Sequence, residues 1–177
     1  HTTNQKLAGL ESRNQAKTFI YALIYGAGNE KLGAVAKGSK KLGTKLRKQF
    51  IDNLPSYKAL IGRVERASGK GFLKGLDGRK LYVRTKHAAL NTLLQGAGSI
   101  VMKQGLIIFD SLIKEKGLDA AFVANVHDEW QLEVSEEDAE EVGNLGVQSI
   151  IKAGEALDLK CPLDGDYNVG TNWSETH

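Results

Sequence analysis

The feature that most restricts the fold is a stretch in the C-terminal half where an apolar run of strand length is followed by alternation of period two. AAFVANV at residues 120–126 precedes the charged step His127-Asp128-Glu129, and WQLEV then alternates at residues 130–134. This pattern predicts a β-hairpin whose bend carries the acids. Helical periodicity predicts a mostly apolar helix before the hairpin and an acidic surface helix after it. Helices combined with an antiparallel hairpin indicate the α+β class.

Further elements follow from periodicity and from residues that begin and end helices. The expected helices cover residues 13–26, 40–53, 56–68, 88–116 and 135–154, and short strands are expected at residues 72–74 and 80–84. Gly26 and Gly28 are expected to end the first helix. Ser135 with Asp138 resembles a capping box that opens the last helix. The tail from residue 161 to residue 177 is expected to return to a sheet edge.

Composition limits the class of protein. The chain has 177 residues, enough for one ordinary domain or two small ones, and 41% of them are hydrophobic, as in globular proteins. The single cysteine, Cys161, excludes an internal disulfide framework and a zinc site built on several thiolates. No apolar run approaches the roughly 18 residues that cross a bilayer, and the N-terminus lacks the apolar core of a signal peptide. An intracellular protein without a membrane partner is therefore expected.

Charge is distributed unevenly along the chain. Residues 1–86 hold 19 Lys and Arg against 5 Asp and Glu, whereas residues 87–177 hold 5 against 16. A basic half suggests a polyanionic partner whose phosphates are neutralised by lysine and arginine. For either half alone, a charged surface that only keeps the protein soluble is the alternative, and the contrast between the halves argues against it.

The first candidate site is one face of the helix expected at residues 13–26. At 100° per residue, two cations and two phenols lie on one stripe about 18 Å long. They are Arg13, Lys17, Tyr21 and Tyr25. Apolar side chains lie on the opposite face, at Ala16, Phe19 and Leu23. This order suits a ligand with an anionic end and a flat or sugar-like end. The alternative is an amphipathic helix with half-buried tyrosines.

The second candidate site is the bend of the hairpin. Asp128 and Glu129 follow an apolar strand, so rigid backbone holds at least one carboxylate. Mg²⁺ takes oxygen ligands and uses one or two protein carboxylates together with substrate phosphates and water. Two metal ions about 3.5 to 4 Å apart are usual in phosphoryl and nucleotidyl transfer. A solvated turn is the alternative, and neighbouring residues on a strand point to opposite faces, so the two acids need not be equal ligands.

The third candidate site is a polar stripe at the start of the long apolar helix. If the helix already runs through Arg84, three further polar side chains share one face with it. They are His87, Asn91 and Gln95. Aligned amides can read hydrogen-bond acceptors in the minor groove of a nucleic acid, where purine N3 and pyrimidine O2 look alike. The alternative is a helix whose polar side meets water or another loop.

Three segments together resemble the C-terminal part of a family A DNA polymerase, the bacterial polymerase I type. They are RNQAKTFIYALIYGAG, KGLDGRKLYVRTKHAALNTLLQGAGS and VHDEWQLEV. The first segment matches the fingers motif, in which Arg, Lys, an aromatic residue (Tyr or Phe) and Tyr-Gly follow one another at intervals of four residues. The third segment matches the palm motif His-Asp-Glu. The nearest likeness is to the replicative polymerases of short-tailed bacteriophages. The likeness covers the chain from end to end, with fingers expected at residues 1–84 and a palm portion at residues 85–177.

The resemblance implies a role for each side chain that meets the incoming nucleotide. Arg13, Lys17 and His1 would hold the triphosphate of the dNTP. Lys17 would also donate a proton to the leaving pyrophosphate. Tyr21 would pack against the sugar and base, and tyrosine here implies tolerance of dideoxynucleotides. Tyr25 would stack near the templating pair and help to exclude a 2′-hydroxyl.

The resemblance also implies roles in catalysis and in DNA binding. Asp128 would be a ligand of Mg²⁺, with Glu129 as its weaker neighbour, while two Mg²⁺ ions stabilise the attacking and leaving oxygens. Four further side chains would follow the minor groove of the primer-template DNA. They are His127, Arg79, Asn91 and Gln95.

The chain departs from the family in one respect. The palm motif with the second catalytic aspartate belongs some tens of residues before His1, so the second carboxylate ligand is expected in an N-terminal segment of the same chain or in a split subunit. Without that segment no polymerisation is expected. A non-catalytic nucleic-acid-binding module is one alternative, against which Asp128, Lys17 and Arg13 argue. A metal-dependent nuclease is another, which does not explain the tyrosines beside the cations.

Overall fold

The computed structural model describes residues 5–6 and 8–176, so His1 lies outside the described residues. The chain forms two compact units, residues 1–94 and 95–177. The division falls inside the long helix α6 (Ala89–Lys116). The combination of helices with two small antiparallel sheets confirms the α+β class. The boundary between fingers and palm at residues 84 and 85 stays a prediction.

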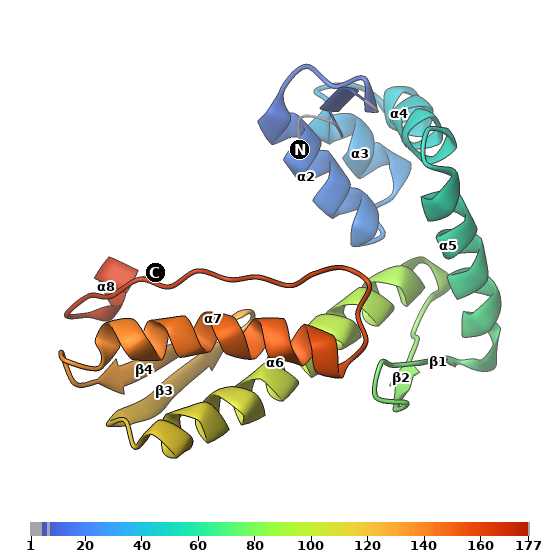
Figure 1. Ribbon diagram of the computed structural model, residues 1–177. Coiled ribbons are helices and arrows are strands. Elements are labelled where there is room, and N and C mark those ends of the chain that lie inside the picture. The colour runs from blue at the N-terminus through green and yellow to red at the C-terminus, as the bar shows by residue number, and fades with distance from the viewer. Residues whose placement is uncertain (1–4, 7, 177) are drawn as a thin grey trace. The chain divides into compact units, whose positions relative to one another are not determined.

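The first unit is mostly helical (Figure 1). Its elements are α2 (Arg13–Ile24), α3 (Asn29–Val35), α4 (Lys40–Asp52), α5 (Pro55–Ala67), η1 (Ser68–Lys70), β1 (Phe72–Lys74), β2 (Lys80–Tyr82) and η2 (Lys86–Ala88). The structure confirms the expected α2, α4, α5 and both strands, which pair antiparallel. It adds α3, which the sequence did not predict because seven residues make too few turns for a periodic signal.

Helix α2 begins and ends as its sequence predicts. Ser12 is the N-cap, and its hydroxyl oxygen accepts a hydrogen bond from the Gln15 backbone N–H at 3.2 Å. Gly26 has φ +78°, the left-handed conformation that stops a helix. Gly28, expected to end α2, is instead the N-cap of α3. The buried face of α2 is Ala16, Phe19 and Leu23.

The core of the first unit lies between α2, α3 and α4. Phe19 and Leu32 are fully buried, and Phe50 of α4 is 4% exposed. The rings of Phe19 and Phe50 meet edge to face with centroids 6.2 Å apart. Burial of one phenylalanine side chain stabilises the folded state by about 2 to 3 kcal/mol. This cluster therefore holds α2 against α4, and the other face of α2 stays exposed.

Close packing of α3 against α4 depends on Gly43. A Cβ at this position would lie 1.9 Å from the backbone oxygen of Asn29 and 2.5 Å from the backbone nitrogen of Gly33. Arg47, one turn later, donates to the Asn29 Oδ1 at 3.0 Å and to the Ala27 carbonyl at 3.3 Å. Helix α4 therefore fixes the start of α3 and the loop before it.

Gly43→Ala is expected to destabilise the first unit by about 1 to 3 kcal/mol, because the added methyl group forces two backbones apart. Urea denaturation followed by circular dichroism measures the change. Gly62→Ala on α5 is the matched control, since its Cβ would meet nothing closer than Arg66 Nη1 at 3.5 Å. Alanine there is expected to be neutral or to stabilise the helix by up to about 1 kcal/mol. Equal losses of stability in both variants would contradict the role of Gly43.

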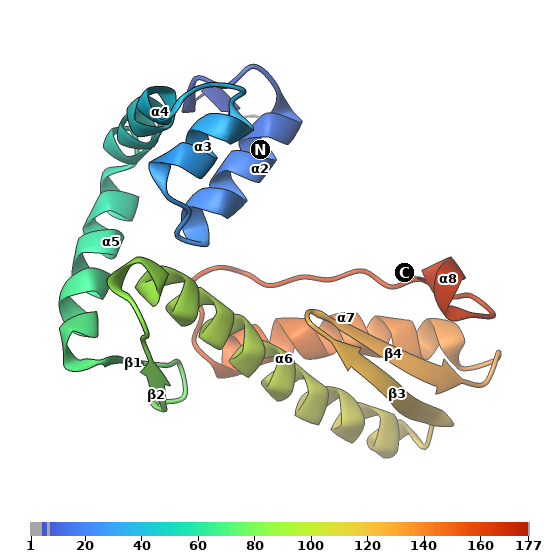
Figure 2. The same ribbon diagram turned by 180° about the vertical axis from the view of Figure 1, so that it is seen from behind.

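The second unit contains a hairpin covered by two helices (Figures 1 and 2). After α6 come β3 (Ala120–Val126), β4 (Glu129–Val134), α7 (Ala139–Ala156) and α8 (Trp173–Thr176). The hairpin pairs Ala120 with Val134 and Val126 with Glu129, and a register shift lies between Phe122 and Ala124. The sequence predicts this hairpin, and the structure confirms it.

One face of the hairpin forms the core of the second unit. Trp130, Leu132 and Val134 pack on a cluster of buried side chains from α6 and α7. That cluster is Phe109, Ile113, Val142 and Leu145. Because side chains alternate along a strand, Glu129, Gln131 and Glu133 lie on the opposite face. Helix α7 buries one side in this core, so it is not the simple surface helix that its acidic residues suggested.

The capping box expected at the start of α7 is wrong. Helix α7 begins at Ala139 with Asp138 as N-cap, so Ser135 is not a capping-box residue. The Asp138 carboxylate instead accepts hydrogen bonds from the Ser135 hydroxyl at 2.9 Å and the Asp119 backbone N–H at 3.3 Å. It thus joins the start of β3 to the start of α7.

The tail after α7 forms no strand in the part that the structure describes and runs back along α7 (Figures 1 and 2). Its side chains pack where α7 has glycines. The Tyr167 ring covers Gly143, and Leu163 lies against Gly154. Tyr167 also donates a hydrogen bond to Glu140 at 2.7 Å. These contacts hold the tail on the helix rather than at a sheet edge.

Helix α6 contradicts the expectation that no run approaches the length of a membrane span. By length and composition alone, the helical stretch Lys86–Lys116 is sufficient to cross a membrane, and 22% of its most apolar window is buried. Apolar helices that pack in a protein core can have the same length and composition. Phe109 and Ile113 of α6 are core residues of the second unit.

Candidate functional site

The exposed face of α2 carries the predicted stripe of cations and phenols. Arg13 and Lys17 are exposed, Tyr21 is 48% exposed, and Tyr25, the residue after the helix, is 54% exposed. The Tyr25 backbone N–H donates to the Tyr21 carbonyl at 2.9 Å, so the helical spacing extends to Tyr25. The structure therefore brings the four side chains onto one accessible surface.

The bend of the β3–β4 hairpin presents the predicted acids. His127 has φ +54°, a left-handed conformation, which lets the chain turn within two residues. Asp128 is exposed at the tip, and Glu129 is partly buried as the first residue of β4. The described residues contain no group of three or more His, Cys, Asp or Glu side chains placed to hold a metal ion. The bend therefore offers two carboxylates, which is a partial set of oxygen ligands for Mg²⁺.

Gln131 contacts one of these acids and is not among the residues predicted from the sequence. Its side-chain Nε2 donates a hydrogen bond to Glu129 Oε1. Gln131 is two residues from Glu129 on β4, so both side chains lie on the same face of the strand. The period-two alternation of β4 predicts that Glu129 and Gln131 share a face, but it does not predict the hydrogen bond between them.

The predicted polar stripe before α6 is only partly correct. Thr85 has extended backbone, His87 lies in the 3-10 turn η2, and α6 begins at Ala89. Arg84 is therefore outside the helix, and a continuous α-helical face from residue 84 to residue 95 does not exist. The cause is the extended residue at position 85, which interrupts the helical hydrogen bonds.

Two members of that stripe do share a face of α6. Asn91 and Gln95 are one turn apart, and Gln95 is exposed. The Asn91 Oδ1 is buried and has no hydrogen-bond partner among the described residues. A buried polar atom without a partner costs free energy, and this oxygen can only accept a hydrogen bond.

Arg79 lies at the turn between β1 and β2. Its Nε donates to Asp77 Oδ2 at 2.6 Å, and this hydrogen bond from Arg79 lowers the pKa of the Asp77 carboxyl. A role of Arg79 in DNA binding requires exchange of this exposed partner for a phosphate or a base edge. Such an exposed ion pair is weak, so the exchange costs little.

The cations and phenols belong to the first unit and the acids to the second. Their convergence around one ligand, and the role of each residue, stay predictions.

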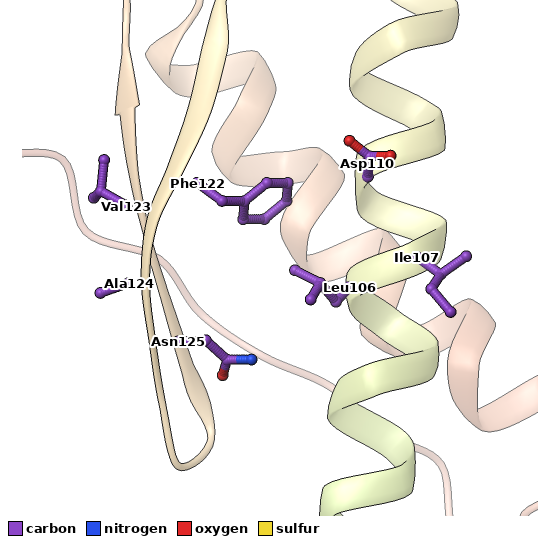
Figure 3. Close-up of a pocket in the computed structure, with 7 residues that line it drawn as sticks. All are labelled: Leu106, Ile107, Asp110, Phe122, Val123, Ala124 and Asn125. Carbon is purple, nitrogen blue, oxygen red and sulfur yellow. The ribbon is translucent and has the colours of Figure 1, made fainter.

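A shallow hollow of about 460 Å³ lies between α6 and β3 (Figure 3). Leu106 and Phe122 point toward each other within it. Ile107 and Val123, at its edges, are 63% and 60% exposed. None of the candidate site residues lines this hollow.

Comparison with known proteins gives consistent matches. Residues 2–175 match the family model of DNA polymerase family A. The DNA-directed DNA polymerase of Escherichia phage Phieco32 is 41% identical to this chain. The match includes all of this chain and 30% of the phage protein. The DNA-directed DNA polymerase of Escherichia phage T7 is 38% identical over the whole chain, which covers 28% of it.

More distant proteins agree. DNA polymerase I of Aquifex aeolicus is 32% identical over 93% of this chain and 30% of its own length. Among solved structures, the POL domain of Pol1 from M. smegmatis, in complex with DNA primer-template and dNTP, matches 80% of this chain and 27% of that one. Its TM-score is 0.72 at 27% identity. The chain thus spans less than one third of the length of each of these relatives.

Proposed function

Because the chain belongs to DNA polymerase family A, we propose that it is the C-terminal part of an enzyme that adds nucleotides to a DNA primer under the direction of a template. The observation that carries the proposal is the exposed face of α2, which presents two cations and then two phenols at one-turn intervals. A nucleoside triphosphate has the same order of an anionic end and a sugar-and-base end. A nuclease site has no need of this order.

In the proposed reaction the primer 3′-hydroxyl loses its proton to solvent and its oxygen bonds to the α-phosphorus of the dNTP, while the bond from that phosphorus to the bridging oxygen breaks. Arg13 and Lys17 bind the phosphates, and Lys17 gives a proton to the pyrophosphate as it leaves. Tyr21 packs against the sugar and base, and Tyr25 stacks near the templating pair. His1 is proposed as a further phosphate contact.

The acids of the hairpin bend fit a hard divalent cation, because both supply oxygen donors and Asp128 is exposed. Asp128 is the proposed ligand of Mg²⁺, and Glu129 is its weaker neighbour. When bound, two Mg²⁺ ions stabilise negative charge on the attacking and leaving oxygens. The second carboxylate ligand belongs to an N-terminal polymerase segment in the same chain or in a split subunit.

Primer-template DNA is the proposed second substrate. Asn91 and Gln95 donate to minor-groove acceptors that are the same in every base pair, so they test pairing geometry rather than sequence. Arg79 and His127, both exposed, are the proposed additional contacts to the DNA.

Primer extension tests the proposal. The complete polymerase that contains this chain is expected to extend a primer in a template-directed manner when Mg²⁺ is present. The 177-residue chain alone is expected to give no product, since its bend carries only part of the metal ligands. Gel analysis of primer length measures both. Binding of primer-template DNA by the complete protein without any extension would support the non-catalytic binding module instead.

Tyr21→Phe is the control that ties extension to the α2 face. A dideoxynucleotide lacks the 3′-hydroxyl, and the phenolic hydroxyl of Tyr21 supplies a hydrogen-bonding group in its place. Loss of one such hydrogen bond changes the selectivity between dideoxynucleotides and deoxynucleotides by roughly tenfold. The ratio of dideoxynucleotide to deoxynucleotide incorporation is therefore expected to fall about tenfold. An unchanged ratio would show that Tyr21 is not at the sugar of the incoming nucleotide.

A further inference from the structure

A chain of hydrogen bonds connects Glu129 at the hairpin bend to the C-terminal helix α8. Gln131 Nε2 donates to Glu129 Oε1, and the Thr176 hydroxyl donates to Gln131 Oε1 at 3.2 Å. Gln131 and Thr176 are 45 residues apart in sequence, and both hydrogen bonds are partly buried. The primary amide of Gln131 is suited to this position, because it is a donor and an acceptor at once.

Helix α8 holds Thr176 in place through its own hydrogen bonds. The Glu175 carboxylate accepts from the Thr171 backbone N–H at 2.7 Å and from Asn172 Nδ2 at 2.9 Å. The Thr171 backbone N–H is the main cause that lowers the pKa of the Glu175 carboxyl. The Thr176 hydroxyl also lies 3.2 Å from the Trp173 carbonyl, so its single proton serves two acceptors.

The tail that carries α8 is itself anchored on α7. Tyr167 bonds to Glu140 at 2.7 Å and covers Gly143, where even a methyl group would not fit beside the ring. These contacts fix the tail at Tyr167, nine residues before Thr176. The hydrogen bonds of Thr176 and Gln131 then connect α8 to the start of β4.

We propose that Gln131 is a positioning residue that restricts the carboxylate of Glu129, and that Thr176 restricts Gln131. The inference rests on the proposed function, in which Glu129 lies beside the metal-binding Asp128. A glutamate side chain has several rotamers, and ordering it before the reaction removes an entropic cost from the chemical step. The C-terminal helix therefore contributes to catalysis through the palm hairpin without touching the substrate.

Gln131→Met tests the first link, since methionine has a similar length and neither donates nor accepts a comparable hydrogen bond. In the complete polymerase, kcat is expected to fall about tenfold, with KM for dNTP changed less than about twofold. In a Glu129→Gln background the same substitution is expected to have almost no further effect, because the bond that it removes serves Glu129.

Thr176→Val and Thr176→Ser test the second link as a matched pair. Valine keeps the shape and removes the hydroxyl, and kcat is expected to fall roughly threefold, whereas serine restores the bond and the rate. Hydrogen exchange of the complete polymerase supplies a readout apart from activity. Faster exchange of backbone amides at residues 171–176 is expected in Gln131→Met, because α8 loses its contact with β4.

Distinct results separate the failure of this inference from that of the proposed function. If Glu129→Gln lowers kcat but Gln131→Met and Thr176→Val do not, the positioning role is wrong and the catalytic assignment of Glu129 stands. If Glu129→Gln leaves kcat at its normal value, the catalytic assignment of Glu129 and the positioning role of Gln131 are both wrong. Should Gln131→Met fail to fold, equal rates for Thr176→Val and Thr176→Ser would still overturn the proposal.

Discussion

Asp128→Asn is expected to lower the rate of nucleotide incorporation by the complete polymerase by on the order of 10³-fold. Asparagine keeps the size of the side chain and removes the negative charge that binds Mg²⁺. Asp128 is exposed at a two-residue bend, so the substitution leaves the core of the second unit intact. Single-turnover incorporation at saturating dNTP measures the chemical step, and circular dichroism checks the fold.

Glu133→Gln is the matched control for Asp128→Asn. Glu133 is an exposed acid on β4, on the same unit, and no role in the reaction is proposed for it. Its substitution is expected to change the rate less than about twofold. A normal rate for Asp128→Asn would show that the bend does not hold the catalytic metal ion.

Lys17→Ala is expected to reduce kcat/KM for dNTP by about 10² to 10³-fold, because it removes both a phosphate contact and the proposed proton donor. Lys17 is exposed on α2 and contributes nothing to its buried face, so the helix remains folded. Pre-steady-state kinetics separate the loss of triphosphate affinity from the slower chemical step.

Lys17→Arg distinguishes the two roles of this side chain. Arginine keeps the positive charge and binds phosphate, but it does not release a proton at neutral pH. Affinity for dNTP is therefore expected to recover while the maximal rate stays low. Lys31→Ala on α3, also exposed, is the control for a general loss of charge. Equal effects of Lys17→Ala and Lys31→Ala would mean that Lys17 has only a nonspecific electrostatic role.

Elements with a strong local pattern could be predicted from the sequence. Phe19 and Leu23 share a face at helical spacing, and Trp130, Leu132 and Val134 alternate at strand spacing, so α2 and β4 follow from neighbouring residues. Short elements and helix starts were harder. Helix α3 depends on the missing Cβ of Gly43, and the start of α7 depends on how Asp138 bonds to Asp119.

The candidate site shows the same division. The exposed stripe on α2 and the acids at the bend were predicted, since each set lies within one element or one turn. The helical face from Arg84 to Gln95 was wrong because one extended residue, Thr85, precedes the helix. Gln131 was missed because its bonds to Glu129 and Thr176 are side-chain contacts that no periodicity encodes.

The sequence by itself determined the α+β class, the order of the family motifs and the identity of the chemical groups, because these depend on residue type and on spacing within single segments. Only the tertiary structure decided where the tail lies and which side chain donates a hydrogen bond to Glu129. The tail lies on α7 because Gly143 and Gly154 leave room for Tyr167 and Leu163. Contacts of this kind join residues far apart in the chain, and their geometry arises only when whole elements pack together.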